Sequence, residues 1–542
     1  MTVRTPFLLS QAVDQSADRL SDHPAFECEG DILVYQDLAR RSNQLAHALM
    51  EQGVRRGDRV GIWRNKGLDT AIAIFGILKT GAAYVPIDPM APVERVAFIL
   101  RDADIKCLIS GNPHRGKLLE LLRLECPVEC VVGADDLDGR TRCLSWAAVD
   151  GYQEGNPGVR MTEMDLAYIM YTSGSTGTPK GLMHTHGSGL AYARLSARTF
   201  GVTNSDRLGN HAPLHFDIST FEYFVAPLCG ATTVIVTEET ALFPAAVADL
   251  IEESRLTFWY SVPLALIRML EAGVIDGRDM GALRWVKFGG EPFPPKHLRR
   301  LMELWPHARF SNIYGPAEVN QCTYFHVPAA YDFSMPVPIG APWENTDIAI
   351  VDENDNPVPP GSQGELLVRS PTMMLGYWNR PDLNARAFYD REPVNGLRQR
   401  YYRTGDIVRT DDGGLLHFVG RKDRQIKMRG FRLELDEVEN VLAASPGVSE
   451  AAVVALRAAD GTVNRLAAAI LLGEQSVSSA QALEAIRSFA VRRLPGYSLP
   501  EQIEILAEFP RTGTGKCDRK RIEECLASSV QSVAASSTRL PT

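Results

Sequence analysis

The sequence lacks a long apolar run. No stretch of the 542 residues reaches about 18 apolar residues, the length a helix needs to cross a membrane, and the N-terminus has too short an apolar segment for a signal peptide. Basic residues are not in excess either. The net charge of −9 excludes a broadly basic surface for nucleic acid or anionic lipid. We therefore expect small molecules and proteins as partners, with no nucleic acid and no membrane.

Cysteine pairs at metal-ligand spacing are also missing. The nine cysteines are scattered, and the only close set, Cys126 and Cys130, has no second pair. This usage predicts reduced thiols in a cytoplasmic protein. The sequence shows no internal repeat, and it contains no GxxxxGK[ST] string, which argues against a P-loop kinase or ATPase.

Helical and strand patterns alternate over the first part of the chain. Residues 38–52 form an amphipathic helical pattern, residues 59–63 predict a strand, and residues 70–79 predict a second helix. Apolar strand patterns return at residues 232–236 and 257–261. Such alternation predicts an α/β fold with parallel sheets covered by helices.

The chain is too long for one compact domain. Residues 1–422 are predicted to form a large N-terminal domain, whose part from about 345 to 422 is a β subdomain with Pro/Gly turns. Residues 423–525 mix helical and strand patterns and predict a small mobile α+β domain. The Ser- and Ala-rich residues 526–542 predict a disordered tail.

Residues 166–181, LAYIMYTSGSTGTPKG, predict a strand that leads into a phosphate-binding loop. The glycines allow a tight turn close to an anion, the hydroxyl side chains donate hydrogen bonds, and Lys180 adds a positive charge. A flexible linker is the alternative, but linkers rarely lie between an apolar strand and a lysine. The loop residues assigned to the nucleotide are Thr172, Ser173, Gly174, Ser175, Thr176 and Gly177.

Other segments carry further candidate site residues. HFDISTFEYF (215–224) places Asp217 just after an aromatic residue, where a helix cap or an ion pair is the alternative role. FGGEPFP (288–294) and NIYGPAEVNQC (312–322) are strand-to-loop passages whose glycines admit a flat ring, at the strand ends where ligands are expected. The remaining candidates are YYRTGD (401–406), GRKDRQIKMRG (420–430) and PRTGTGKCDRK (510–520).

These strings resemble the signatures of the adenylate-forming superfamily, which includes acyl-CoA synthetases, luciferases and the adenylation domains of nonribosomal peptide synthetases. Together with LKTGAAYVPIDP (78–89), which also matches the family, they follow the family's order from residue 78 to 520. The resemblance implies an AMP-forming ligase that uses ATP and Mg²⁺. It would adenylate an amino acid, release pyrophosphate, rotate its small domain about Asp423, and load the phosphopantetheine thiol of a separate carrier protein in antibiotic-type biosynthesis.

The resemblance also implies roles in nucleotide binding. Gly289, Gly290 and Glu291 would border the adenine, Tyr314 would stack on it, and Glu318 would help to hold Mg²⁺. Asp406 would accept hydrogen bonds from the ribose hydroxyls, and Arg421 would support the same sugar. Lys516 would neutralise the charge that develops as the substrate carboxylate attacks the α-phosphate. Further members of the nucleotide site are Asn312, Gly315 and Ala317, the last standing where the family usually has Thr.

For the amino acid, the resemblance makes Asp217 the partner of the substrate ammonium and places His215 beside the substrate carboxylate. Bulky Phe221 and Tyr260 shorten the implied pocket and favour a small substrate. Small neutral, proline-like and β-amino acids remain open. The implied lining is Ile218, Phe221, Tyr260, Lys287, Gly289, Ile313, Gln321 and Cys322.

Lys287 is unusual among these residues. It lies in the strand pattern LRWVKF, and a buried lysine requires an anionic or acceptor partner. A polar or carboxylate group of the substrate and a carboxylate of the protein itself are the two candidates.

Two functional alternatives stay open at this stage. One is an acyl-CoA synthetase that uses free coenzyme A. The other is a catalytically silent nucleotide-binding protein, which would be expected to lose Lys516, Glu318 or Asp406, although all three are present.

Overall fold

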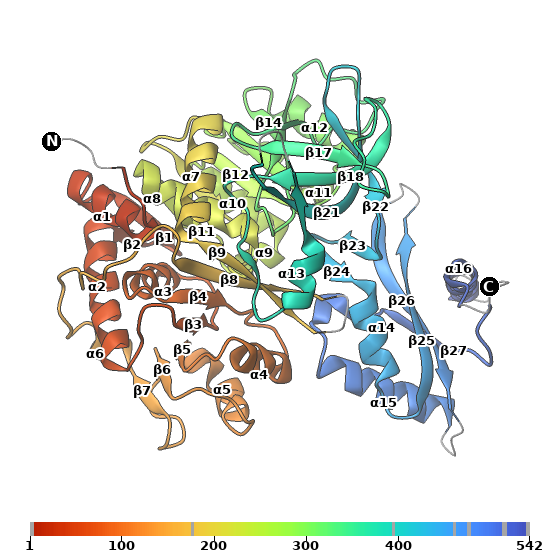
Figure 1. Cartoon of the computed structure of the whole chain (residues 1–542), viewed down its shortest axis with the longest axis horizontal. Coiled ribbons are helices and arrows are strands. Elements are labelled where there is room, and N and C mark those ends of the chain that lie inside the picture. Colours follow the sequence, from red (N-terminus) through yellow and green to blue (C-terminus); the bar gives the residue numbers. More distant parts are fainter. Residues whose placement is uncertain are drawn as a thin grey trace. The chain divides into compact units, whose positions relative to one another are not determined.

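The computed structural model describes residues 5–174, 178–392, 396–458, 462–473, 478–511 and 517–537. The chain divides into two compact units (Figure 1). The first contains Met1–Pro89, Ile99–Tyr171 and Gly181–Lys422, and the second contains Met90–Phe98, Thr172–Lys180 and Asp423–Thr542. The predicted α/β class, with a large N-terminal part and a smaller C-terminal part, is confirmed.

One sheet has eight strands, in the order β19-β9-β8-β4-β3-β5-β6-β7. From β8 to β7 all neighbours are parallel, which requires crossover connections that the intervening helices supply. The strands are β3 (Arg59–Ile62), β4 (Ala83–Pro86), β5 (Cys107–Ile109), β6 (Cys130–Val132), β7 (Arg142–Leu144), β8 (Leu166–Thr172), β9 (Lys180–Thr185) and β19 (Gly376–Tyr377).

A second sheet has nine strands, in the order β16-β15-β14-β13-β12-β10-β11-β1-β2. Its centre, from β1 to β14, is parallel, and antiparallel strands flank both edges. The strands are β1 (Pro24–Cys28), β2 (Asp31–Val34), β10 (Arg207–Asn210), β11 (Thr232–Ile235), β12 (Phe258–Ser261), β13 (Trp285–Gly289), β14 (Arg309–Tyr314), β15 (Thr323–Val327) and β16 (Ala341–Pro342).

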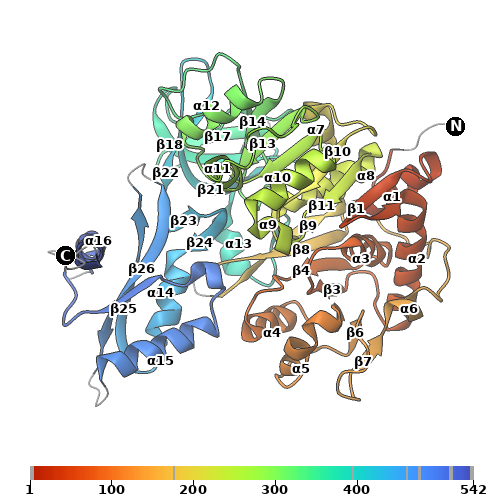
Figure 2. The same cartoon turned by 180° about the vertical axis from the view of Figure 1, so that it is seen from behind.

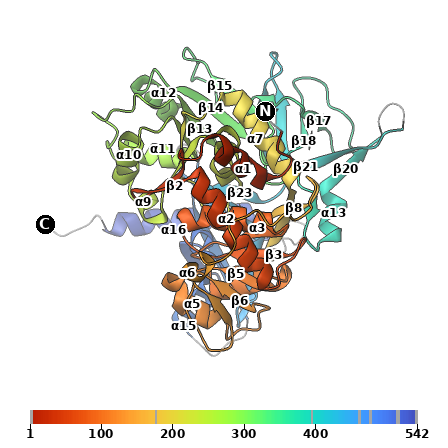
Figure 3. The ribbon, with the colours of Figure 1, turned by 90° about the vertical axis from the view of Figure 1, so that its left-hand side faces the viewer.

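Helices cover both sheets. One core joins α2, α3 and α7 to strands of the two sheets, and a second packs α10, α11 and α12 against β12–β14 (Figure 2). Helices α1, α2 and α3 lie together (Figure 3). The helices are α1 (Leu9–Arg19), α2 (Tyr35–Glu51), α3 (Leu68–Lys79), α4 (Val93–Asp102), η1 (Asn112–His114), α5 (Arg115–Leu121), α6 (Trp146–Val149), α7 (His186–Phe200), η2 (Asp217–Ser219), η3 (Phe221–Val225), α8 (Ala226–Cys229), α9 (Glu238–Leu242), α10 (Pro244–Glu253), α11 (Pro263–Glu271), α12 (Pro295–Leu304) and α13 (Pro381–Ala387).

Helix α3 is apolar on every side and is buried from Thr70 to Lys79, as expected of a core helix. Its one basic residue is fully partnered. The Lys79 ammonium donates to the carboxylate of Asp14 at 2.7 Å, the side-chain oxygen of Asn43 at 2.6 Å and a backbone carbonyl at 3.2 Å. These three acceptors offset the cost of burying the charge.

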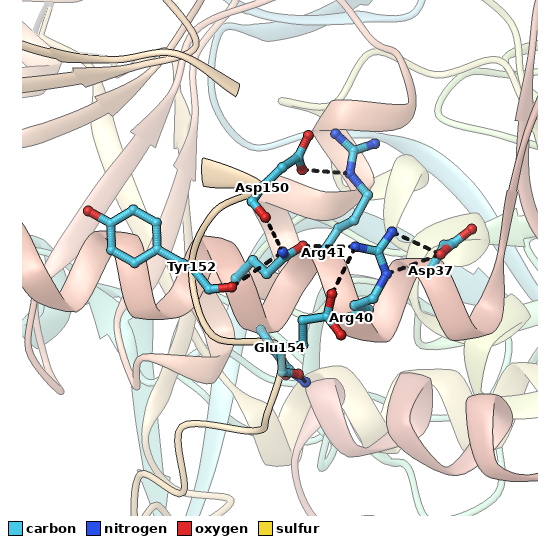
Figure 4. Close-up of polar contacts among 8 residues, drawn as sticks. Asp37, Arg40, Arg41, Asp150, Tyr152 and Glu154 are labelled. Atoms are coloured by element: carbon cyan, nitrogen blue, oxygen red, sulfur yellow. Dashed lines mark hydrogen bonds and ion pairs between the residues drawn. The ribbon is translucent and has the colours of Figure 1, made fainter. Parts of the chain in front are cut away.

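The polar face of α2 holds the loop that follows α6 (Figure 4). The Gln44 amide donates to the backbone oxygens of Asp150 and Tyr152 at 2.5 and 3.3 Å. Arg40 contacts Asp37 at 3.0 Å and Glu154 at 3.4 Å. The amide contacts satisfy backbone carbonyls that would otherwise depend on water, so this loop is fixed without regular secondary structure.

The β subdomain is a five-stranded antiparallel sheet, with β22 paired to β21 beside the path β17-β18-β21-β20. Its apolar face buries Leu366, Val368 and Val408. The strands are β17 (Asp347–Val351), β18 (Gln363–Arg369), β20 (Phe388–Arg391), β21 (Gln399–Thr410) and β22 (Leu416–Arg421).

The second unit has its own core. Apolar side chains of α14, α15 and the hairpin β25–β26 pack together, and β27 extends that sheet in parallel with β26. A two-stranded ribbon, β23–β24, precedes α14. The elements are β23 (Gln425–Met428), β24 (Phe431–Glu434), α14 (Leu435–Ala443), β25 (Val448–Arg457), β26 (Val463–Leu472), α15 (Ser479–Val491), η4 (Gly496–Ser498), β27 (Gln502–Ile505) and α16 (Arg519–Ser537).

Helix α16 (Arg519–Ser537) covers most of the segment from residue 526 for which the sequence predicts a disordered tail. Ile522 and Leu526 are buried against β25 and β26, and Ala is a strong helix former. Among the described residues, no helix combines the length and the apolar character that a membrane crossing requires.

Candidate active site

Asp217 lies in a loop whose backbone is tied down by a buried lysine. The Lys66 ammonium donates to the carbonyl oxygens of Asn210, His211 and Ala212 at 2.9, 3.0 and 3.1 Å, at the end of β10. Burial lowers the pKa of Lys66 to about 8, partly opposed by Glu238. The chain then turns into η2, which begins at Asp217. Sequence reasoning missed Lys66, since a lysine after a short strand usually lies in solvent.

His215 lies between this anchored segment and Asp217. Its Nε2 is 4.0 Å from the carboxylate of Asp88, and its ring contacts that of Phe216 at 4.7 Å between centroids. His215 therefore lies two residues before Asp217, the predicted partner of the substrate ammonium, and has the carboxylate of Asp88 nearby.

The predicted pocket residues come together in the nine-stranded sheet. Strand register places Tyr260 next to Lys287 and Gly289 next to Ile313, so each pair shares a face. The Gln321 amide donates to the Tyr260 hydroxyl at 2.7 Å, and the Phe221 ring lies edge-on to Tyr260 at 5.9 Å. Of the other two predicted members, Cys322 is buried beside the Tyr314 carbonyl and Ile218 is partly buried.

Lys287 is completely buried, and its ammonium has no hydrogen-bond partner among the described residues. It faces the rings of Phe221, Tyr260 and Phe200, with Nζ 3.3, 4.3 and 4.4 Å from the centroids. Burial holds the pKa of Lys287 well below its ordinary value, against the pull of Glu222. Three cation–π contacts of about 0.5–2 kcal/mol each offset part of the several kcal/mol that burying an ion costs, but they supply no hydrogen-bond acceptor.

Glu222 is a second buried titratable group that sequence reasoning missed. It accepts a hydrogen bond from the Asn210 amide at 3.0 Å and lies in the π-helical turn η3. Burial raises its pKa to about 8, partly opposed by Asn210 and Lys287. A group with this pKa is mainly protonated at neutral pH, so it does not supply a full negative charge to Lys287.

The glycines of the nucleotide passages are close to neighbouring backbone. A Cβ on Gly289 would lie 2.3 Å from the Ile313 carbonyl, and one on Gly315 would lie 2.3 Å from the Asn320 carbonyl. Gly290 has φ +93°, a conformation that favours glycine. These positions are therefore restricted to glycine for steric reasons.

Asp406 is the centre of a buried polar cluster. Its Oδ1 accepts from Arg421 at 2.7 Å, and its Oδ2 accepts from the Tyr314 hydroxyl. Arg421 also donates to the Thr404 carbonyl at 2.7 Å. Burial, and then Asp406, raises the pKa of Tyr314. The cluster joins β14 to β21 and β22 and leaves further lone pairs on the carboxylate for a ligand.

Glu318 is fully buried and accepts a hydrogen bond from the Tyr377 hydroxyl at 2.8 Å. The neighbouring Ala317 uses its carbonyl to accept from His184 at 3.1 Å. Asn312 donates to the Pro338 carbonyl at 2.8 Å, and Glu291 follows the Gly289–Gly290 turn. These contacts orient the passage from β14 without depending on the threonine that is missing at 317.

The structure describes only part of the predicted phosphate-binding loop. Ser175, Thr176, Gly177 and Lys516 lie outside the described residues. Thr172 ends β8, Lys180 begins β9, and a Cβ on Gly174 would lie 2.1 Å from the Thr178 carbonyl, which fits a tight loop. The segment Thr172–Lys180, which includes Ser173, belongs to the second compact unit, whose main segment begins at Asp423.

Comparisons with known proteins identify the class. Residues 13–378 match the family model "AMP-binding enzyme", and residues 437–516 match "AMP-binding enzyme C-terminal domain". The chain belongs to the AMP-binding enzyme family, as the resemblance predicted, and it is an AMP-forming ligase that uses ATP.

Individual relatives extend this result. The chain is 35% identical to an L-proline--[L-prolyl-carrier protein] ligase of Streptomyces coelicolor, over 96% of this chain and 97% of the relative. It is 34% identical to tyrocidine synthase 1 of Brevibacillus parabrevis, over 97% of this chain but only 46% of that longer protein. The adenylation domain AlmE of Vibrio cholerae, solved with glycyl-adenosine-5'-phosphate, has a TM-score of 0.82 at 25% identity and covers 97% of this chain and 99% of its own.

Proposed function

We propose that this protein adenylates the carboxylate of an amino acid with ATP and then transfers the aminoacyl group to the thiol of a carrier protein. The observation that carries the proposal is the position of Asp217. A buried ammonium holds the backbone that leads to it at the end of β10, and Asp217 lies near Tyr260, which contacts Phe221 and Gln321. A fixed carboxylate beside a buried pocket suits a substrate that carries an ammonium group. Relatives named as amino acid–carrier protein ligases support it.

Residue roles follow from this assignment. Asp217 holds the substrate ammonium, and His215 lies by the substrate carboxylate. Asp406 and Arg421 hold the ribose, and Tyr314 stacks on the adenine between the Gly289–Gly290 turn and Gly315. The substrate carboxylate attacks the α-phosphorus, pyrophosphate leaves, and the thiol then attacks the carbonyl and releases AMP.

The residues present fit a magnesium ion. Glu318 supplies one buried carboxylate, oriented by Tyr377, and a hard cation bound with phosphate oxygens needs few protein ligands. Its chemistry would be to neutralise phosphate charge. Among the described residues, no group of three or more His, Cys, Asp or Glu side chains is arranged to hold a metal ion by itself.

Two lysines, Lys180 and Lys516, and the hinge residue Asp423 have further roles in the proposed reaction. Lys180 and the hydroxyl loop from Thr172 contact the phosphates, and Lys516 neutralises the charge that develops at the α-phosphate. Rotation of the small domain about Asp423 exchanges Lys516 for the incoming thiol. We assign the thiol to the phosphopantetheine arm of a carrier protein in the cytoplasm.

ATP–pyrophosphate exchange across a panel of amino acids and simple carboxylic acids tests the first step. We expect exchange with amino acids only, and its loss in Asp217→Ala and Lys516→Ala. Exchange with carboxylic acids that lack an ammonium group, surviving in Asp217→Ala, would move the protein to the acyl-CoA synthetases. No exchange with any acid would overturn the proposal.

The acceptor is tested separately. Incubation with amino acid and ATP is expected to load the phosphopantetheinylated form of a carrier protein and to leave both its unmodified form and free coenzyme A unloaded. Formation of an aminoacyl-coenzyme A thioester instead would establish coenzyme A as the acceptor.

A further inference from the structure

Three lysines are buried in the described part of the chain, and they differ in their partners. Lys79 donates to Asp14, Asn43 and a carbonyl, and Lys66 donates to three carbonyls. Lys287, the most deeply buried of the three, has no hydrogen-bond acceptor among the described residues. Two of the lysines are therefore satisfied within the fold, whereas Lys287 makes no hydrogen bond to a described residue.

Among the described residues, Lys287 has no carboxylate partner that would neutralise the charge of its ammonium group. No ion pair joins it to a described carboxylate within 4.0 Å. Glu222, the carboxyl group that acts on it electrostatically, already accepts from Asn210 and is mainly protonated at neutral pH. The neighbouring Gln321 keeps an unpartnered side-chain oxygen while its amide is engaged by Tyr260.

We propose that Lys287 binds a carboxylate on the substrate side chain, so that the amino acid activated by this protein has an anionic side chain. This inference rests on the proposed function, because Lys287 adjoins Tyr260 in the sheet and touches Phe221, the rings that line the amino-acid pocket. A carboxylate supplies a hydrogen-bond acceptor for Lys287 and, by its negative charge, favours the protonated form that burial disfavours, which a neutral side chain does not.

Phe221 and Tyr260 bound the distance available to the side chain. The Lys287 Nζ lies 3.3 and 4.3 Å from the centroids of these rings, so the two bulky groups fill part of the space around it and favour a short side chain. L-Aspartate is the first member of the class, and L-glutamate is the next.

Pairs of nearly isosteric amino acids test this on the unaltered protein by ATP–pyrophosphate exchange. We expect kcat/KM for L-aspartate to exceed that for L-asparagine on the order of 10²-fold, with the same direction for L-glutamate over L-glutamine. Preference for an amide, or for L-proline, glycine or L-alanine, overturns the inference and leaves the proposed function intact. Absence of exchange with every amino acid overturns both.

Variants locate the effect in one residue. Lys287→Met is expected to lower the acid-over-amide ratio on the order of 10²-fold. Lys79→Met, which removes another buried lysine, is expected to leave that ratio unchanged. Retention of the ratio in a folded Lys287→Met protein contradicts the assignment. If Lys287→Met does not fold, the acid-over-amide ratio of the unaltered protein decides.

Discussion

At the scale of single residues, the sequence predicted site residues that lie in family-like motifs, and it did not predict the buried charged residues that support them. Asp217, Tyr260, Gln321 and Asp406 stand in recognisable strings. Lys66 stands in no such string, and its role comes from contacts with a segment far away in the sequence. Glu222 does lie in the string at 215–224, but its burial beside Asn210 is visible only in the structure. Local pattern carries no signal for such contacts, whereas a buried ammonium with three carbonyl partners is unmistakable in the structure.

Lys66→Met should weaken amino-acid binding more than ATP binding. The variant removes three hydrogen bonds from the backbone that leads to Asp217, while the Asp406 cluster stays intact. A displaced catalytic or binding group typically costs on the order of 10²-fold. We expect KM for the amino acid to rise by one to two orders of magnitude, measured by exchange at saturating ATP.

The control for this experiment is Lys296→Met, which alters an exposed lysine on α12 and should change neither KM. Equal increases in KM for ATP and for the amino acid in Lys66→Met would show a general loss of structure instead of a displaced loop.

Asp406→Asn should act on the nucleotide. The amide cannot accept from both Arg421 and Tyr314 as the carboxylate does, and it brings a donor into the cluster. We expect KM for ATP to rise on the order of 10–10²-fold with the amino-acid preference unchanged. Exchange kinetics with ATP varied would reveal it, and an unaltered KM for ATP would remove Asp406 from the nucleotide site.

At the scale of elements, periodicity predicted the core helices and strands well. Strand β3 and helix α3 occur within two residues of the predicted positions, because each is a continuous apolar segment bounded by polar residues or glycine. The C-terminal helix α16 was missed. Its composition is that of a polar tail, and among the side chains that the structure describes, up to residue 528, the buried Ile522 and Leu526 reveal its attachment to the second unit.

Leu526→Ala should therefore destabilise the second unit. It removes a fully buried side chain from the cluster with Ile522 and Phe509. Truncation of a buried leucine to alanine costs about 2–5 kcal/mol. We expect a lower midpoint in the denaturant unfolding transition of that unit. Glu524→Ala, on the exposed side of α16, is the control, and equal stability of the two variants would show that the helix is not packed there.

At the scale of the whole molecule, the sequence predicted a two-part α/β chain but not which polar groups the sheets enclose. Three histidines of the first unit, of which His184 and His186 are buried and His211 is partly exposed, have strongly lowered pKa values. Burial lowers the pKa of His184 and His186 to about 4 and that of His211 to about 3. His184 stacks on Tyr168 at 4.8 Å between centroids, and the His186 Nδ1 accepts from the Leu9 backbone at 3.2 Å.

These histidines should make the first unit sensitive to acid. Their ordinary pKa is 6.5, so below that pH the unfolded chain binds protons that the folded chain excludes. The contribution of these histidines to the free energy of unfolding is therefore complete above pH 6.5. It falls as the pH drops toward 4, by up to about 1.4 kcal/mol per pH unit for each histidine. Urea unfolding at pH 7, 6, 5 and 4.5 measures this slope.

His184→Gln keeps a donor and an acceptor beside Ala317 but cannot take up the proton. The dependence of its unfolding free energy on pH should therefore be shallower by up to one proton. An identical slope in the variant would assign the acid sensitivity to carboxylates instead.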